Sequence, residues 1–231
     1  MVHFSSSTSG LNPVIQVVEG DELLRPLVSS LAHSIGIPCR AFASPHEFLE
    51  QYSPGQPGCI VLDILIPGMC GLQLQHELNR RGNITPILFV TGHTNVPSVV
   101  EAMRRGAMNY LIKPVSSEDL VDNLRCALDY DRCIREAHTR LDSIRARILS
   151  LTPREREVLD LVARGCANKA MAQEMGLSRR TVELHRARMM EKMAARSVAD
   201  LVRMLLDFER PAATVSYMSA ESRGLPVRER A

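Results

Sequence analysis

The first half of the chain alternates between short apolar runs and amphipathic stretches. The apolar runs lie at residues 13–18, 39–43, 59–64, 86–90 and 109–113. The stretches between them carry apolar residues at helical spacing, as in residues 21–36, 71–82 and 95–107. Strands that alternate with helices predict a parallel sheet covered by helices on both faces. The near-continuous apolar character of runs such as 59–62 fits strands that are buried on both sides.

A longer helical pattern without Gly or Pro follows, from Ser116 to about Leu149. Ser116 and Asp119 have the spacing of a capping box, which predicts that the helix begins there. Residues then recur every seven positions in two series, Leu120, Ala127, Ile134, Leu141 and Ile148 in the first and Asn123, Tyr130, Ala137 and Ile144 in the second. This repeat predicts a coiled-coil-like helical linker over residues 129–150. A single helix that packs against its own domain is the alternative.

The last third of the chain predicts a small helical domain at residues 151–208. Thr152 and Pro153 predict the start of one helix, and Gly165 predicts its end. A short helix over 168–175 and a longer one over 178–193 follow, joined by a tight turn at Gly176. Two helices joined by a short turn that contains Gly fit helix-turn-helix spacing. The two ends of the chain, residues 1–12 and 209–231, have the composition of disordered tails.

Composition limits the class of protein. Hydrophobic residues make up 45% and charged residues 23% of the chain, as in ordinary globular proteins. No apolar run approaches the ~20 residues that cross a bilayer, and the N-terminal residues lack the basic and apolar regions of a signal peptide. We therefore expect a cytoplasmic protein without a membrane partner. Its six cysteines have no metal-ligand spacing, so we expect reduced thiols.

Charge is spread unevenly along the chain. The net charge is only +2, but residues 169–196 hold seven basic and three acidic residues. A local basic excess of this kind indicates a polyanionic partner for that segment. An ordinary solvated surface is the alternative interpretation of the charge taken alone.

Polar and charged residues stand at the carboxyl ends of four predicted strands. Glu19 follows the first strand, Asp63 the third, Thr91 the fourth and Lys113 the fifth. The carboxyl ends of parallel strands lie at one edge of the sheet, where such sheets bind ligands. We therefore expect these side chains to converge on one crevice. The chemistry they could share is phosphoryl transfer to a carboxylate, with Asp63 as nucleophile and Lys113 as a point charge on the phosphate. One such acid alone is more often a helix cap, so the ordered group carries the prediction.

Residues 14–128 resemble the receiver domain of two-component response regulators. The resemblance rests on Asp63 in LDILIPGMCG, Thr91 in FVTGH, Lys113-Pro114 in YLIKP, and Tyr110. It implies a receiver at 13–128 with the flavodoxin-like, doubly wound α/β fold and strand order 2-1-3-4-5. It also implies that Asp63 is the phosphoacceptor, Lys113 the phosphate-binding residue, and Thr91 and Tyr110 the switch residues. A cis Lys113-Pro114 peptide bond is expected as well.

The resemblance further implies a bound Mg²⁺, but one of its ligands is missing. The family has a pair of acids after the first strand, and here the pair falls on Glu19 and Gly20. Asp21 lies one position further along and is expected to point elsewhere. The remaining candidate ligands are Glu19, Asp63 and the backbone carbonyl of Leu65. We therefore expect weak Mg²⁺ binding.

Residues 151–206 resemble LuxR-type DNA-binding domains through LTPREREVL, NKAMAQEMGLS and TVELHRARMMEKM. The resemblance implies an all-α, four-helix helix-turn-helix domain that binds double-stranded DNA. On the recognition helix, ~100° of rotation per residue places Val182, Met189 and Met193 on the side of the core.

The other sides of the recognition helix supply the candidate DNA contacts. The exposed side and its borders hold Arg180, Glu183, Leu184, Ala187 and Arg188, of which the last four are best placed for base edges. The flanks and the start of the preceding helix hold the phosphate candidates Lys169, Arg179, Thr181, His185, Arg186 and Lys192. A lone histidine such as His185 is more often packed or capping than bound to DNA.

Together these features predict a non-enzymatic response regulator of the FixJ-like (NarL) class with a LuxR-type domain. A sensor histidine kinase would phosphorylate Asp63, the protein would form a homodimer, and the paired domains would bind promoter DNA, with RNA polymerase as a further candidate partner. The alternative is a degenerate receiver that binds DNA without phosphorylation, and Gly20 keeps it open. A phosphatase of the dehalogenase type would need an acid where Leu65 stands, which disfavours that enzyme class.

Overall fold

The computed structural model describes residues 11–93 and 95–209 of the chain. It divides into two compact units, with the boundary after Glu136. The N-terminal unit holds an α/β sheet, and the C-terminal unit is helical. Almost all of the two predicted tails, residues 1–10 and 210–231, lies outside the described residues.

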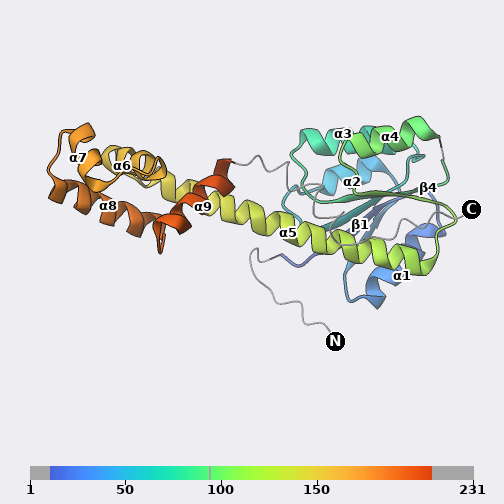
Figure 1. Ribbon diagram of the computed structural model, residues 1–231. Coiled ribbons are helices and arrows are strands. Elements are labelled where there is room, and N and C mark those ends of the chain that lie inside the picture. Colours follow the sequence, from blue (N-terminus) through green and yellow to red (C-terminus); the bar gives the residue numbers. More distant parts are fainter. Residues whose placement is uncertain (1–10, 94, 210–231) are drawn as a thin grey trace, which may run out of the picture. The chain divides into compact units, whose positions relative to one another are not determined.

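The N-terminal unit is built on a five-stranded sheet in the order β2-β1-β3-β4-β5 (Figure 1). The strands are β1 (Val14–Val18), β2 (Cys39–Phe42), β3 (Gly58–Leu62), β4 (Ile87–Thr91) and β5 (Asn109–Ile112). Every pair of neighbouring strands is parallel. All residues of β3 and β4 are buried, as their continuous apolar runs predict. The predicted strand order and the doubly wound fold are confirmed.

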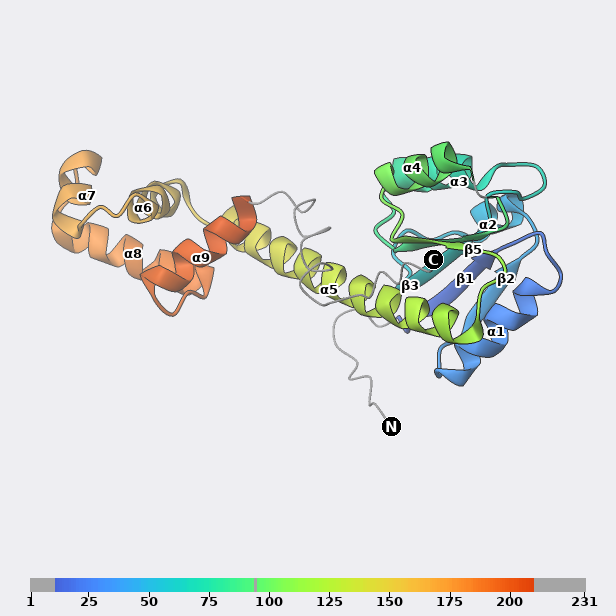
Figure 2. The ribbon, with the colours of Figure 1, turned by 45° about the vertical axis from the view of Figure 1, so that its right-hand side comes forward.

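Helices cover both faces of this sheet (Figure 2). They are α1 (Leu24–Ser34), α2 (Pro45–Gln51), α3 (Gly71–Arg80), α4 (Val96–Arg104) and the first half of α5 (Ser117–Leu149). Apolar residues of α1 and α5 pack in one core cluster, and those of α2, α3 and α4 pack in another across the sheet. The apolar pattern does not reveal α2, because seven residues are too few to show a helical period. The Lys113-Pro114 peptide bond is cis, as expected.

Helix α5 runs without a break through the start of the predicted linker. Asp131, which is 2% exposed, accepts a hydrogen bond from the Gly58 amide at 2.9 Å and one from Arg135 Nε at 2.8 Å. Arg135 also donates to the carbonyl oxygens of Gly55 and Gln56 at 3.1 and 2.8 Å. The sheet unit therefore contacts α5 as far as Arg135. This part of α5 agrees with the alternative of a single helix that packs against its own domain.

The predicted heptad series has members in both units. Leu120 and Ala127 pack in the core of the sheet unit. Ile144 is also buried, whereas Ile134 and Leu141 are half-buried. Pairing of the series with a second chain stays a prediction.

The C-terminal unit contains α6 (Pro153–Ala163), α7 (Asn168–Met175), α8 (Arg179–Met193) and α9 (Val198–Glu209). Local signals set its helix ends. Thr152 and Glu155 form a capping box at the start of α6, and Ser178 caps α8. Gly176 ends α7 in the left-handed conformation, with φ of 65°. The predicted helix-turn-helix is therefore present, at nearly the predicted bounds.

Candidate functional sites

The predicted site at the carboxyl edge of the sheet is assembled by strand register. Val18 pairs with Leu62 across β1 and β3, so the next residues, Glu19 and Asp63, come out side by side. Thr91 pairs with Ile112 across β4 and β5, which places Lys113 one residue beyond. All four predicted side chains thus leave the sheet at its carboxyl edge.

Lys113 bridges the two acids of this site. Its Nζ lies 2.7 Å from Glu19 Oε2 and 2.9 Å from Asp63 Oδ2. Both acids are buried, and the Lys113 side chain is 22% exposed. Buried carboxylates are stable as charges only when paired or hydrogen-bonded, and here one ammonium serves both.

The environment keeps Asp63 ionised. Burial alone would raise its pKa, but hydrogen bonds from Thr91 and Lys113 outweigh burial, so the pKa is lowered from its ordinary value. Glu19 differs, because burial outweighs its hydrogen bond from Lys113 and raises its pKa. Burial would lower the pKa of Lys113, but hydrogen bonds to Glu19 and Asp63 raise it. Asp63 is therefore a carboxylate at neutral pH, as a nucleophile must be.

The loop after β1 does not bring another acid into the pocket. Asp21 is exposed, and its side chain accepts a hydrogen bond from the Leu23 amide at 2.8 Å, away from the pocket. The Asp21 amide donates to Glu19 Oε1 at 2.9 Å, so both oxygens of Glu19 have partners. A Cβ at Gly20 would lie 3.1 Å from Pro67 Cδ, and its φ is not in the left-handed range. The backbone therefore does not exclude a side chain at this position.

The acids of this pocket are compatible with a divalent cation. Among the described residues, no group of three His, Cys, Asp or Glu side chains could hold a metal ion. Two carboxylates, those of Glu19 and Asp63, face the same pocket. Mg²⁺ is commonly held by one or two carboxylates and keeps several waters, so these two acids and one backbone carbonyl are compatible with it.

The two predicted switch residues hold the same loop residue, His93. Thr91 Oγ1 accepts a hydrogen bond from the His93 amide at 3.1 Å, and the Tyr110 hydroxyl donates to the His93 carbonyl. His93 Nε2 also lies 2.7 Å from Asn95 Nδ2, and Asn95 caps α4. Sequence reasoning missed His93, whose only signal is its place two residues after Thr91.

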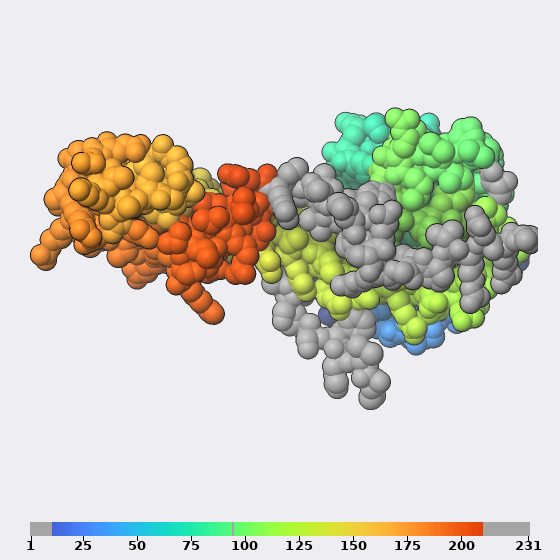
Figure 3. All heavy atoms as spheres, in the orientation of Figure 1, coloured from blue at the N-terminus to red at the C-terminus, as the bar shows by residue number. Residues whose placement is uncertain are grey.

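Helix α8 has the predicted division of faces. Val182, Met189 and Met193 are fully buried against the core of the C-terminal unit. The base-edge candidates and their neighbour, Arg180, Glu183, Leu184, Ala187 and Arg188, are all exposed. Figure 3 shows side chains of the orange segment, which includes α8, projecting from the surface of this unit. The Leu184 side chain is 49% exposed, which is compatible with contact with a thymine methyl group.

The phosphate candidates differ in how they are held. Lys169 is exposed. Arg179 Nε lies 3.2 Å from Glu183 Oε1 in an exposed pair, and Arg186 Nη1 donates to Asn168 Oδ1 at 2.5 Å. The remaining flank residues, Thr181 and His185, are half-buried. These placements are compatible with contacts to DNA, and the contacts themselves stay predictions.

Lys192 is the exception among the phosphate candidates. Its Nζ lies 2.6 Å from Glu155 Oε2 and 3.2 Å from the Ser150 carbonyl oxygen. The hydrogen bond from Lys192 is the main reason that the pKa of Glu155 is lowered to about 2. The charge of Lys192 is therefore already paired within the protein.

Comparison with known proteins identifies both units. Residues 15–125 match the response regulator receiver domain, and residues 149–205 match the luxR family of bacterial regulatory proteins. Nodulation protein W of Bradyrhizobium diazoefficiens is 40% identical over 87% of this chain and 88% of its own. The chain belongs to the two-component response regulators. The transcriptional regulatory protein FixJ of Azorhizobium caulinodans is 38% identical to this response regulator, over 83% of this chain and 91% of its own.

Solved structures agree with this membership. The response regulator StyR matches with a TM-score of 0.77 and 37% identity, over 84% of this chain and 98% of its own. Full-length FixJ from B. japonicum matches with a TM-score of 0.53 and 34% identity, over 86% and 98%. The chain is therefore a DNA-binding transcriptional regulator of a two-component system, in a family that is generally non-enzymatic. Nothing in these comparisons favours the degenerate-receiver alternative. Within the described part of the chain, no helix is long and apolar enough to cross a membrane.

Proposed function

We propose that a sensor histidine kinase transfers a phosphoryl group to Asp63 and that this transfer controls promoter binding by α8. The observation that carries the proposal is the contact between Lys113 Nζ and Asp63 Oδ2 at 2.9 Å, in a pocket where the pKa of Asp63 is lowered. The ionised aspartate has an electron pair that can attack phosphorus. The adjacent ammonium can stabilise the negative charge of the incoming phosphoryl group.

In the proposed reaction, an Asp63 oxygen attacks the phosphorus atom of the kinase's phosphohistidine. The bond from phosphorus to the imidazole nitrogen breaks, and the nitrogen keeps the electron pair. Lys113 then neutralises a phosphoryl oxygen. Mg²⁺, held by Glu19, Asp63 and the Leu65 carbonyl, would supply further charge neutralisation at the phosphoryl oxygens. Glu19 also orients Lys113, through the hydrogen bond at 2.7 Å.

The proposed switch is based on the hydrogen-bond partners of Thr91. Its hydroxyl oxygen accepts a hydrogen bond from the His93 amide, and the hydroxyl also donates to Asp63. When a phosphoryl group occupies Asp63, the Thr91 hydroxyl turns to a phosphoryl oxygen. His93, in the loop that joins β4 to α4, then loses its hydrogen bond to Thr91, and its hydrogen bond from Tyr110 is free to rearrange. Phosphorylation would thus alter the α4 and β5 surface.

We further propose that this cytoplasmic protein acts as a homodimer on a two-fold symmetric promoter site. Two helix-turn-helix units bound to two half-sites gain affinity from their linkage, which is the reason to expect a dimer. Glu183, Leu184, Ala187 and Arg188 would face base edges, and Lys169 would contact phosphate. RNA polymerase is a further proposed partner.

The proposal is tested by phosphorylation of the full chain with acetyl phosphate. We expect an added phosphoryl mass that requires Mg²⁺ and is absent in Asp63→Asn, together with tighter binding to promoter DNA. The degenerate-receiver alternative predicts no mass change and equal DNA binding in both proteins. That result would overturn the proposed role of Asp63.

A further inference from the structure

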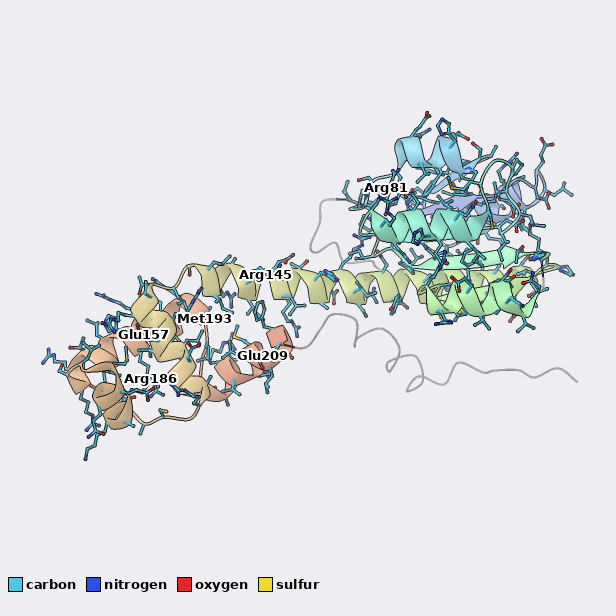
Figure 4. All side chains as sticks on the ribbon, turned by 90° about the horizontal axis from the view of Figure 1, so that it is seen from above. Arg81, Arg145, Glu157, Arg186, Met193 and Glu209 are labelled. Atoms are coloured by element: carbon cyan, nitrogen blue, oxygen red, sulfur yellow. The ribbon has the colours of Figure 1, made fainter. Side chains whose placement is uncertain are left out.

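The C-terminal end of α8 is held by residues from two other segments of the C-terminal unit. We call the α8-end cluster the group made up of Arg147, Ser150, Glu155, Lys192 and the Met193 carbonyl. Figure 4 labels Met193 and shows the end of α8 beside the last turns of α5. The cluster joins the end of α5, the start of α6 and the recognition helix α8 through hydrogen bonds, in addition to apolar packing.

Arg147 caps the recognition helix from the linker helix. Its Nη1 donates to the Met193 carbonyl oxygen at 3.0 Å. That carbonyl is one of the last four of α8, which have no partner within the helix, and an arginine there also complements the helix dipole. Met193 itself is fully buried, so the end of α8 is fixed on both its apolar and its polar side.

Lys192 ties the same helix end to α6. Its ammonium contacts Glu155 and the Ser150 carbonyl, and the Glu155 side chain is only 4% exposed. Glu155 Oε2 also accepts the Thr152 amide at 2.9 Å, so one carboxylate oxygen serves both the N-terminus of α6 and the C-terminus of α8. Pulling Lys192 toward a phosphate would leave a buried carboxylate without its cation, which is costly.

From these contacts we infer that Lys192 and Arg147 position the recognition helix and that Lys192 does not bind phosphate. The last turn of α5, which contains Arg147, then helps to orient the helix that binds DNA. A helix that enters the major groove by its N-terminal residues needs a fixed far end, because a small tilt there moves every base contact. The inference rests on the proposed function in one respect, that α8 reads DNA.

Salt dependence separates the two roles of a lysine. Each phosphate contact contributes about 0.9 to the slope of log affinity against log salt concentration. Lys169→Met is the matched control for Lys192→Met, because Lys169 is exposed at the start of α7 and is proposed to bind phosphate. The DNA is a duplex selected by the wild-type protein from a random library, compared with a scrambled duplex of equal length.

For full-length Lys192→Met we expect about tenfold weaker binding to the selected duplex, little change on the scrambled duplex, and an unchanged salt slope. Lys169→Met should weaken binding to both duplexes and lower the salt slope by about 0.9. A lowered slope in Lys192→Met would overturn the inference, because Lys192 would then be a phosphate contact. Unchanged preference for the selected duplex would overturn it as well.

Arg147 gives a second test that leaves the buried ion pair intact. Arg147→Ala should lose preference for the selected duplex, and Arg147→Lys should keep most of it, since an ammonium can still donate to the Met193 carbonyl. Equal preference in Arg147→Ala and wild type would overturn the role of Arg147. If wild type itself does not distinguish the duplexes and Leu184→Ala binds as wild type does, the proposed function of α8 fails instead.

Discussion

The Lys113 ammonium lies 2.7 Å from the Glu19 carboxylate and only slightly farther, 2.9 Å, from Asp63. The pocket thus has two acids and one internal cation, with Gly20 where the resemblance to receiver domains implies a further acid. The net charge of this pocket is therefore one unit less negative than that of a pocket with three acids. This difference leads to a direct test of metal affinity.

Gly20→Asp should tighten Mg²⁺ binding by about tenfold and speed phosphorylation of Asp63, because it adds a carboxylate near the ion. The new Cβ would lie 3.1 Å from Pro67 Cδ, which requires only a small shift of that ring. Gly20→Asn is the matched control, since it has the same size without the charge. Calorimetric titration with Mg²⁺ measures the affinities, and equal values for all three proteins would show that residue 20 is not the missing ligand position.

Acid should destabilise the C-terminal unit through Glu155. Its carboxyl has a pKa of about 2 in the folded protein, against an ordinary value of 4.5, chiefly because Lys192 hydrogen-bonds to it. The contribution of this group to stability is complete above 4.5 and is lost as the pH falls toward 2. Urea unfolding of wild type and Glu155→Gln across that range should show a difference that shrinks on acidification. A difference that is constant with pH would contradict the prediction.

Arg135→Met should lower the free energy of unfolding of the receiver unit by about 3–5 kcal/mol, because it leaves Asp131 charged and buried without its partner. The Asp131 side chain is 4% exposed. Arg132→Met, which breaks an exposed pair with Asp129 one turn away, should cost less than about 1 kcal/mol. Chemical unfolding of the full chain measures both. Adding Asp131→Asn to Arg135→Met should recover part of the loss.

Ala194→Gly should stabilise the C-terminal unit by about 0.5–1 kcal/mol. Ala194 follows α8 with φ of 50°, a left-handed conformation that an L-residue with a Cβ adopts at a cost. Ala195→Gly is the control, because that residue does not have positive φ and should gain nothing. Thermal unfolding compares the three proteins, and an equal effect at both positions would argue against relief of strain.

Glu183→Gln should change sequence preference at a single base step, because a carboxylate accepts from cytosine N4 whereas an amide can also donate. The change also breaks the exposed pair with Arg179, whose Nε lies 3.2 Å from Glu183 Oε1. Arg179→Gln is the control that breaks this pair alone. Selection of duplexes from a random library should give a different consensus for Glu183→Gln only. The same altered consensus in both variants would assign specificity to the pair instead.

Sequence patterns alone predict which segments form the strands, the edge of the sheet that carries the pocket and the bounds of the helix-turn-helix. These features follow from local signals, whereas the strand order was implied only by the resemblance to receiver domains. Apolar runs mark buried strands. Helix ends lie at or next to the residues that signal them, which are Thr152, Gly176 and Ser178. Asp63 and Lys113 could be found because parallel strands bring their ends to one edge, whatever the details of packing.

The tertiary structure alone decided how those pieces are joined. Asp131 meets Gly58 across 73 positions of the chain, and Lys192 meets Glu155 across 37, pairings that no periodicity encodes. The helical pattern therefore predicts Lys192 as a phosphate contact, whereas the packed unit pairs its ammonium with the buried carboxylate of Glu155. Helical period fixes which face a side chain occupies. Only packing between helices fixes which group that face meets, because many partners are compatible with one face and the close-packed core selects one of them.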